Sequence, residues 1–469
     1  MKTLKYDLVV VGAGSGGYAA ARTARDLGAT VAMVDHGPLG GLCILRGCMP
    51  SKTLIASSNV AQDVRDGAEL GIHAGEPHVD LAQIQERKRG IIKGFTDYRV
   101  GGIQSFPTYN GDARFLGPKT LAVGDDLILE GKNFVIGTGS SIAPAAVPGL
   151  EEAGFIDSDA ALELAALPKS LVVLGGGYVA AELGQYFARL GVEVSMIIRA
   201  RHLFSSEDRD VGDAITLYFR SDGIAVEASA QLSRVEKRGA KKAVFYTQEG
   251  QEKSIEADEI FYALGRLPNV AGLDLEKAEV AYHAVSGIEI GDDIRTTNPH
   301  IFAVGDVTGR FPLVHVAIYQ GEIAARNAVT GGSEKADYSL QKTHTIFTEP
   351  QVAIAGETEK ELAAAGTPYL VSSYLFSDHG KAIAIGKTKG FVKLMASPAD
   401  GKLLGGAIVG PEASDLIHEI LVALFYGGTV YDLMKIPHLH PTLAEIITYP
   451  AEDIAAQIAQ GAPQIAAAV

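Results

Sequence analysis

The chain has 469 residues, of which 47% are apolar and 21% charged, a composition typical of soluble globular proteins. This length exceeds that of one hydrophobic core, so we expect roughly three to four domains. The formal net charge of −15 argues against non-specific binding to nucleic acid or to anionic membranes. No apolar run approaches the ~20 residues that span a bilayer. Asp7 and Gly12 leave no apolar stretch long enough for a signal peptide, so we expect a cytoplasmic protein.

The first predicted unit, over residues 6–35, runs strand, glycine turn, helix and strand. Gly12 permits a tight turn, Gly14 lets the backbone approach a pyrophosphate, and Gly17 lets the helix pack closely on the strand. The helix N-terminus then offers free N–H groups to the phosphate. Asp35, at the end of the second strand, can accept hydrogen bonds from a ribose diol. This arrangement predicts a dinucleotide site.

The only two cysteines of the chain, Cys43 and Cys48, follow this unit within the stretch Gly40–Lys52. Two thiols separated by four residues and placed beside a dinucleotide indicate a disulfide that a flavin can reduce and reoxidise. A loop this short gives little entropic stabilisation, which argues against a structural disulfide. The alternative is that both cysteines are packing residues, but the neighbouring Gly-Gly and Pro-Ser-Lys favour a shaped turn.

The same unit recurs over residues 170–199. Its glycine pattern consists of Gly175, Gly177 and Ala180. Two such units in one chain imply two dinucleotides. Here the second strand ends in Ile198, and the expected acid is replaced by the basic residues Arg199 and Arg201. A cationic cluster suits a 2′-phosphate and favours NADPH over NADH, although a solvated basic turn remains the alternative.

Three further predicted strands end in turns. Two lead into Gly139 and Gly265, and each would close one nucleotide-binding unit. The third leads into Asp306 after the second unit. From about residue 341, strand-like alternation mixes with helical stretches and the glycine pattern is absent, which indicates a separate domain.

Together these motifs resemble the FAD-dependent pyridine nucleotide-disulfide oxidoreductases of class I. The resemblance rests on both glycine patterns, on C-x4-C followed by Pro-Ser-Lys, and on Val-Gly-Asp at Asp306, and it covers essentially the whole chain. The segment His438–Glu445 is similar to the HxHPTLxE stretch of dihydrolipoamide dehydrogenases. The family implies an α/β fold with two Rossmann-like dinucleotide-binding domains and a C-terminal α+β dimerisation domain.

The resemblance also implies the domain order, a homodimer and the cofactors. The implied domains are an FAD-binding domain beginning at 1–145, an NAD(P)-binding domain at 146–270, a central domain at 271–340 that completes the FAD site, and a dimerisation domain at 341–469. The implied cofactors are FAD with NADPH or NADH, and no metal is expected.

Residue roles follow from the same resemblance. Cys48 matches the flavin-side sulfur and Cys43 the sulfur that exchanges with substrate. Lys52 matches the lysine near flavin N5, and Glu182 matches its acidic partner. Tyr178 matches a residue that covers the nicotinamide pocket in relatives. Lys52 and Glu182 could instead be surface charges.

Two further matches lie later in the chain. Asp306 matches the acid on the flavin ribityl chain, with a plain turn acid as the alternative. His440 matches the catalytic acid–base, oriented by Glu445 and contributed by the other subunit. Glu445 also fits the last position of a helix capping box that begins at Thr442.

The implied reaction moves electrons between NAD(P)H, FAD, the Cys43–Cys48 pair and a dithiol, with dihydrolipoamide and lipoamide as the favoured substrate pair and a lipoyl carrier as a possible partner. The alternative is an NADPH-dependent reductase of a low-molecular-weight disulfide, because Ser15 and Arg22 resemble glutathione reductase. Glu322, however, stands where glutathione reductases carry a substrate-binding arginine. Mercuric reductases and large thioredoxin reductases need a further thiol or selenol pair, which this sequence lacks.

Overall fold

The computed structural model describes residues 2–461 and divides into two compact units. Unit 1 comprises residues 1–53, 85–144 and 265–341, and unit 2 comprises residues 54–84, 145–264 and 342–469. The predicted domain boundaries stay predictions. Across the described residues, no helix is both long and apolar enough to cross a membrane.

Unit 1 is built on a seven-stranded mixed sheet with β1 (Lys2–Val11) at its centre. Its other strands are β2 (Val31–Asp35), β3 (Thr108–Asn110), β4 (Ala113–Gly117), β5 (Thr120–Val123), β6 (Leu127–Ile136) and β18 (Ile301–Ala303). The order is β3-β2-β1-β6-β5-β4, and β18 lies parallel to the last residues of β6. Residues 8–11 are buried, as expected for a parallel strand covered on both faces. The chain after the second glycine unit therefore returns to the first sheet.

Two helices of unit 1 lie together over this sheet, α1 (Ser15–Asp26) and α9 (Val314–Thr330). A Cβ added to Gly321 in α9 would lie 2.3 Å from the Gly16 carbonyl oxygen, so the two backbones touch where the side chains are absent. The remaining elements include α2 (Leu42–Arg46), the first turn of α3 (Cys48–Asp66), α4 (Leu81–Ile103), β7 (Ser140–Ile142), β15 (Arg266–Pro268), β16 (Tyr282–His283) and β17 (Gly287–Ile288).

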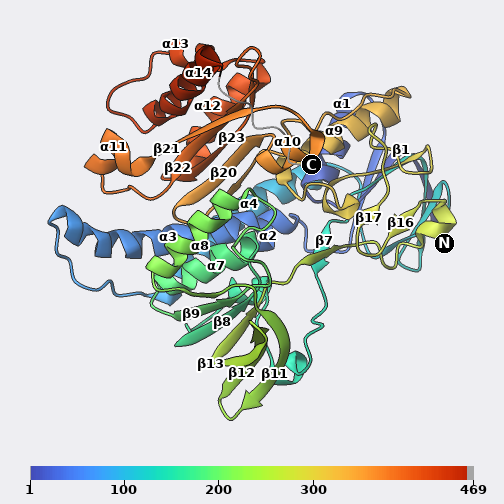
Figure 1. The fold of residues 1–469 in the computed structure, drawn as a ribbon. Helices are drawn as coiled ribbons and strands as arrows, with labels where there is room; N and C mark the ends of the chain where they lie inside the picture. Colours follow the sequence, from blue (N-terminus) through green and yellow to red (C-terminus); the bar gives the residue numbers. More distant parts are fainter. Residues whose placement is uncertain (1, 462–469) are drawn as a thin grey trace. The chain divides into compact units, whose positions relative to one another are not determined.

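Unit 2 contains a four-stranded parallel sheet in the order β10-β9-β8-β14, of which Figure 1 labels β8 and β9. Its elements are β8 (Ser170–Leu174), α7 (Tyr178–Arg189), β9 (Glu193–Ile197), α8 (Arg209–Ser221), β10 (Ala225–Glu227) and β14 (Glu259–Tyr262). A three-stranded antiparallel sheet precedes β14, formed by β11 (Gln231–Arg238), β12 (Lys241–Gln248) and β13 (Gln251–Ala257).

The C-terminal part of unit 2 is a five-stranded antiparallel sheet in the order β19-β20-β23-β22-β21. Its strands are β19 (His344–Ile346), β20 (Gln351–Gly356), β21 (Leu370–Leu375), β22 (Phe391–Ala396) and β23 (Leu403–Gly410). The helices of this part are α10 (Glu359–Ala365), α11 (Gly380–Ala384), α12 (Ala413–Phe425), α13 (Val430–Lys435) and α14 (Thr448–Gln460). Helix α12 packs on β20 and β23, and α14 packs on β21.

The predicted fold class is confirmed, with two small differences in the elements. Strand β1 begins at Lys2, before the predicted unit of residues 6–35, because residues 2–6 pair with residues 127–131 of β6. The segment around the cysteines is helical, since α2 ends at Arg46 and α3 starts at Cys48. Pairing with a distant strand and packing of a short turn are tertiary effects that local sequence patterns do not report.

Candidate active site

The first glycine turn lies between β1 and α1 and is shaped for a close ligand. Gly12 has φ +100°, and a Cβ there would lie 2.3 Å from the Gly137 carbonyl oxygen. A Cβ on Gly17 would lie 2.0 Å from the Gly12 oxygen, so α1 approaches the turn more closely than any side chain allows. At Gly14 an added Cβ would meet nothing within 4 Å. Protein packing therefore does not explain the glycine at this position. The open space beside Gly14, at the start of α1, fits a pyrophosphate.

Asp35 ends β2 and turns back toward this glycine turn. One carboxylate oxygen accepts a hydrogen bond from the Ala13 N–H at 2.7 Å, and the other accepts from the Gly37 N–H at 2.7 Å. These bonds fix the carboxylate beside the turn, and each oxygen retains a further lone pair. The side chain is therefore arranged to accept bonds from an adenosine ribose.

Asp306 belongs to a small network that the sequence did not reveal. The Ser140 hydroxyl donates to Asp306 Oδ2 at 2.7 Å, and the Arg266 Nε donates to the Ser140 hydroxyl at 3.0 Å. Arg266 also donates to the Ser140 carbonyl oxygen at 2.7 Å. Gly139 and Gly265 precede the two strands, β7 and β15, that carry Ser140 and Arg266. The sequence predicted Gly139 and Gly265 as site residues. It did not predict Ser140 and Arg266, because these polar residues belong to no distinctive motif.

Cys43 lies in α2, and Cys48 is the first residue of α3. Both are half-buried free thiols. A hydrogen bond to Cys48 raises the pKa of Cys43, and burial raises it further. The pKa of Cys43 is thus held above its usual range, and Cys48 stands at the N-terminus of α3, where the helix dipole favours negative charge. The positive charge of Lys52 acts on Cys43 in the opposite direction, which places that lysine within electrostatic reach of the pair.

The second glycine turn, between β8 and α7, repeats the first with one change. Gly175 has φ +124°, and a Cβ there would lie 2.5 Å from the Ala263 carbonyl oxygen. A Cβ on Gly177 would meet nothing within 4 Å, which matches the open position of the first turn. Ala180 carries its methyl group buried in α7. This turn can therefore receive a second pyrophosphate.

Arg199 and Arg201 follow β9 and both are exposed. No hydrogen bond or ion pair of either guanidinium occurs within residues 2–461. Ile198, which stands where an NAD site carries an acid, is buried. Both arginines are thus unpaired cations beside the second glycine turn, as a 2′-phosphate site requires.

Glu182 lies on the buried face of α7, with 6% of its surface exposed. Its Oε1 accepts a hydrogen bond from the Phe347 N–H at 2.9 Å. Lys52 belongs to the other unit, so the pairing of Lys52 with Glu182 stays a prediction.

His440 and Glu445 form a pair in the C-terminal part of unit 2. The His440 Nδ1 lies 2.9 Å from Glu445 Oε1, and the His440 side chain is 81% exposed. Glu445 Oε2 accepts from the Thr442 N–H at 2.7 Å. This backbone bond and the His440 contact lower the pKa of Glu445. The capping contact and the imidazole contact therefore coexist on one carboxylate, and the Nε2 of His440 faces away from it.

Tyr178, the first residue of α7, makes contacts that the sequence did not predict. Its hydroxyl donates to Glu207 Oε1 at 2.5 Å, and its ring stacks on His344 with centroids 5.6 Å apart. Neither Glu207 nor His344 belongs to a recognisable motif, and both reach Tyr178 only through the fold.

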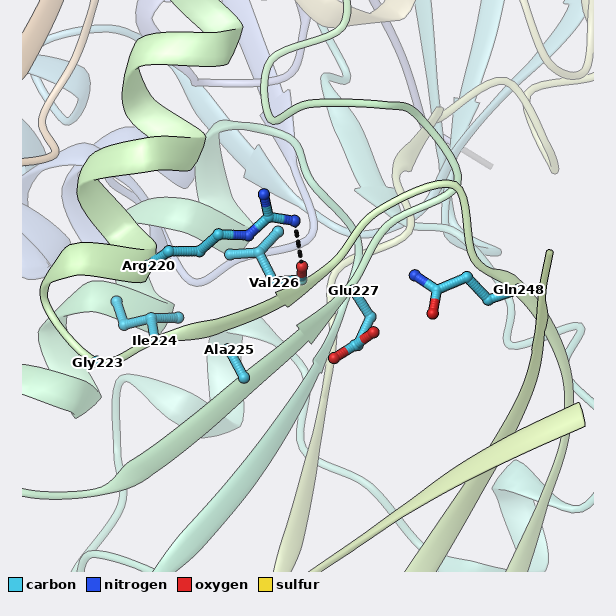
Figure 2. A pocket seen from close by; sticks show the side chains of 7 residues that line it. All are labelled: Arg220, Gly223, Ile224, Ala225, Val226, Glu227 and Gln248. Carbon is cyan, nitrogen blue, oxygen red and sulfur yellow. Dashed lines mark hydrogen bonds between the residues drawn. The ribbon is translucent and has the colours of Figure 1, made fainter. Parts of the chain in front are cut away.

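A surface depression lies elsewhere in unit 2, beside β10. Figure 2 shows its lining residues, which are Arg220, Gly223, Ile224, Ala225, Val226, Glu227 and Gln248. Arg220 donates to the Val226 carbonyl oxygen at 2.7 Å. The predicted site residues do not line this depression, and its arginine is engaged in holding the edge strand.

Known proteins resemble this chain over most of its length. Residues 6–321 match the family described as pyridine nucleotide-disulphide oxidoreductase, and residues 343–451 match its dimerisation domain. A dihydrolipoyl dehydrogenase of Geobacillus stearothermophilus is 35% identical over 470 residues, covering 98% of this chain and 97% of that protein. A mercuric reductase of Staphylococcus aureus is 34% identical over 443 residues, covering 94% of this chain and 81% of that protein.

The fold also matches a solved structure, that of the HOCl-induced flavoprotein disulfide reductase RclA from Escherichia coli. The TM-score is 0.84 at 24% identity, with 95% of this chain and 99% of that chain covered. At this identity the likeness concerns the fold. The two family matches together span nearly the whole chain, and the dimerisation domain fits a homodimer. The chain therefore belongs to the pyridine nucleotide-disulfide oxidoreductases, flavoproteins that use FAD and NAD(P)H.

Proposed function

We propose that this enzyme is an NAD(P)-dependent dihydrolipoyl dehydrogenase, which exchanges electrons between dihydrolipoamide and NAD(P) through FAD and the Cys43–Cys48 pair. The observation that carries the proposal is the pair of half-buried thiols, Cys43 in α2 and Cys48 at the start of α3, together with an exposed His440 held by Glu445. The similarity to dihydrolipoyl dehydrogenases over almost the whole chain supports the substrate.

His440 supplies the proton transfer in this proposal. Because Glu445 accepts from Nδ1, the neutral imidazole carries its proton there and leaves Nε2 free as a base. Nε2 takes the proton of a substrate thiol, and the resulting thiolate attacks the Cys43 sulfur of the oxidised pair. The Cys43–Cys48 bond breaks, and Cys48 leaves as a thiolate.

The second substrate thiol then completes the exchange. Its proton passes to solvent, its sulfur attacks the substrate sulfur that is bonded to Cys43, the substrate leaves as a disulfide, and Cys43 leaves as a thiolate. Cys43 takes up the proton held by His440, which yields the thiol that hydrogen-bonds the Cys48 thiolate. The first glycine turn, Asp35 and Asp306 would hold FAD, which when bound would supply the redox chemistry that links this dithiol to NAD(P)⁺.

The coenzyme of the proposed enzyme is NADPH in preference to NADH. The unpaired Arg199 and Arg201 and the buried Ile198 favour a phosphate over a ribose hydroxyl at this position.

A second candidate is a reductase of a low-molecular-weight disulfide, favoured by the NADPH-type turn and by Arg22. The Arg22 guanidinium, however, lies 3.8 Å from the Glu322 carboxylate. This contact is half exposed and weak, but it places a negative charge beside the residue that would receive a glutathione carboxylate. We therefore rank this candidate below the dihydrolipoyl reaction.

Turnover with purified enzyme tests the substrate. We expect rapid reaction with dihydrolipoamide or lipoamide and little with glutathione disulfide, each measured with NADP(H) and NAD(H). His440→Ala should lower dithiol oxidation by about 10²–10⁴-fold, the usual share of a positioned acid–base. Reduction of the flavin by NADPH should be nearly unchanged, since hydride transfer needs no proton from His440. Faster turnover of glutathione disulfide than of lipoamide would reverse the ranking.

Mixed dimers test whether His440 serves the neighbouring subunit. Inactive His440→Ala and inactive Cys43→Ser proteins, once their subunits have exchanged, should regain activity, because each mixed dimer holds one intact site. Absence of recovery after confirmed exchange would assign His440 to its own chain or remove it from the reaction.

A further inference from the structure

The segment between β9 and α8, residues 198–208, packs on the second glycine turn. The Phe204 N–H donates to the Gly176 carbonyl oxygen at 2.9 Å. A Cβ added to Gly176 would lie 2.9 Å from the Ile198 side chain, so the segment closes this side of the turn. Phe204 is buried and has φ +54°, a left-handed conformation that is strained for a bulky residue. Such a conformation persists only where surrounding contacts hold it.

The end of this segment is held by the first turn of α10. Asp208 is the residue before α8, but its carboxylate makes no capping bond to that helix. Its two oxygens instead accept from the Glu359 and Lys360 N–H groups at 3.1 Å each. The Lys360 ammonium donates to the carbonyl oxygens of Ser205 and Glu207 at 2.7 and 2.5 Å. Four hydrogen bonds therefore fasten the segment to α10.

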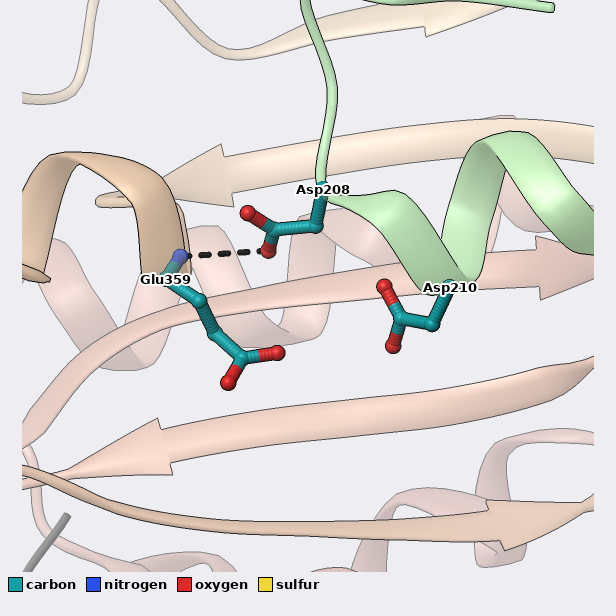
Figure 3. Close-up of side chains that lie close together, drawn as sticks. All are labelled: Asp208, Asp210 and Glu359. Atoms are coloured by element: carbon teal, nitrogen blue, oxygen red, sulfur yellow. Dashed lines mark hydrogen bonds between the residues drawn. The ribbon is translucent and has the colours of Figure 1, made fainter. Parts of the chain in front are cut away.

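A buried lysine joins the same place to the C-terminal sheet. The Lys393 ammonium, carried by β22, lies 2.9 Å from Asp208, 2.8 Å from Asp210 and 2.7 Å from Glu359, each measured to a carboxylate oxygen. Figure 3 shows these three carboxylates converging. Burial lowers the pKa of Lys393, but the charges of Asp210 and Asp208 outweigh it and the net pKa is raised. We call these four residues the Lys393 cluster, in which the lysine supplies the cation.

The bond from Phe204 acts on the part of the turn that faces open space. The Gly176 carbonyl and the Gly177 N–H belong to one planar peptide group and point in opposite directions. A bond that fixes the Gly176 oxygen therefore fixes the direction of the Gly177 N–H. A Cβ on Gly177 would meet nothing within 4 Å, so the space beside this N–H, at the start of α7, is open to a phosphate.

We propose that the Lys393 cluster and Lys360 position the second glycine turn for the coenzyme, so that the C-terminal sheet of unit 2 takes part in coenzyme binding. The cluster and Lys360 hold residues 205–208, these residues keep Phe204 in its strained conformation, and Phe204 orients the peptide group that receives the pyrophosphate. The inference rests on the proposed place of the coenzyme at this turn. It concerns the pyrophosphate and not the 2′-phosphate.

Loosening these contacts should weaken the binding of NADPH and NADH equally. Both coenzymes carry the same pyrophosphate, and the backbone around Arg199 is held separately, because Ile198 and Ala200 bond to residues 227–230. The apparent Kd of each coenzyme should rise about 3–10-fold, the size of one net hydrogen bond. The limiting rate of flavin reduction should change little, since a uniform loss of binding does not alter the chemical step.

The experiment measures reduction of the flavin by NADPH and by NADH in stopped flow, using the FAD-loaded dimer. Lys360→Met removes two bonds to the segment and leaves the buried cluster intact, so it should fold normally and raise both Kd values about 3–10-fold. Lys393→Met should raise both Kd values at least as much and should also lower the melting temperature, because it leaves buried carboxylates without their cation. Lys360→Arg, which keeps donors for both carbonyl oxygens, should bind both coenzymes as the wild type does.

The matched control is Lys342→Met. The Lys342 ammonium pairs with Glu357 and Glu361 at 2.9 and 2.8 Å, so the variant removes ion pairs at the same end of α10 but none of the four bonds to the segment. Both Kd values should stay at the wild-type level. If Lys360→Met and Lys393→Met lower the melting temperature but leave both Kd values unchanged, the positioning role is wrong.

Gly177→Ala tests the place of the coenzyme on which the inference rests. The added methyl group meets no protein atom within 4 Å, so the variant should keep its stability while the methyl group occupies the space proposed for the pyrophosphate. Both Kd values should rise. If Gly177→Ala binds both coenzymes normally, the assignment of this turn to the coenzyme fails, and the positioning role fails with it. If Gly177→Ala weakens binding while Lys360→Met and Lys393→Met do not, only the positioning role is wrong.

Discussion

The two glycine turns of this protein have similar backbone geometry, but the side chains near the end of the following strand carry opposite charges. In both, the first glycine touches the carbonyl oxygen that follows a neighbouring strand, and the second faces open space. The first turn is closed by Asp35, which bonds back to the turn, whereas the second is followed by the exposed Arg199. We therefore propose that the shared geometry serves pyrophosphate binding, and that the side chain at or just beyond the end of the second strand selects which adenosine is accepted.

The third position of the pattern differs for a packing reason. Gly17 lies against the Gly12 carbonyl oxygen, and its helix α1 is pressed by α9 at Gly16 and Gly321. Helix α7 is instead met by the loop after β19, which bonds to it through Glu182, and Ala180 keeps its methyl group there. A methyl group is therefore accommodated at the third position of the second turn, whereas the Gly12 carbonyl oxygen excludes one at Gly17.

The largest expected effect comes from replacing Gly17, the third residue of the first glycine pattern, with the alanine that the second pattern has at this position. Gly17→Ala places a methyl group 2.0 Å from a backbone oxygen that cannot move aside. We expect a loss of about 3 kcal/mol or more in stability, at or beyond the usual range for overpacking, together with loss of bound FAD. Flavin absorbance per chain and thermal melting measure this. The reverse change, Ala180→Gly, should cost at most about 1 kcal/mol, and an equal loss in both variants would contradict the packing difference.

The next effect concerns the acid that closes the first turn. Asp35→Ala removes the acceptor of the Ala13 and Gly37 N–H groups and of the proposed ribose bonds. Because bonds to a charged group contribute about 1.5–3 kcal/mol each, FAD affinity should fall about 10²–10³-fold. Titration of the apoprotein with FAD measures it. Asp125→Ala, an exposed carboxylate of the same unit, should bind FAD normally; a similar loss there would point to net charge rather than to the site.

The smallest effect concerns the basic end of the second turn. Arg199→Glu removes the attraction to a 2′-phosphate and adds an acceptor for a 2′-hydroxyl. The ratio of kcat/KM for NADPH to that for NADH should fall roughly 10–100-fold, the size of one charge-assisted hydrogen bond. Arg209→Glu, whose side chain is 82% exposed on the same domain, should leave the ratio unchanged. Native preference for NADH, unaltered by Arg199→Glu, would identify the arginines as solvated surface.

The motifs that could be predicted without a structure are those whose residues lie close together in the chain. Gly12, Gly14 and Gly17 share one turn, Cys43 and Cys48 share another, and His440 with Glu445 spans five residues. Such spacings fix local geometry through the strand, helix or turn that carries them. The fold class followed for the same reason, since each nucleotide-binding unit is a local strand–helix–strand pattern.

The distant residues that complete these motifs come together only when the chain folds. Ser140 bonds to Asp306 across 166 positions, and Tyr178 meets His344 across the same separation. The Lys393 ammonium reaches Asp208 across 185 positions. Side chains this far apart meet because the strands and helices that carry them pack together, and no local propensity encodes that packing. The motifs could therefore be predicted from the sequence, whereas the distant polar residues that bond to them could not.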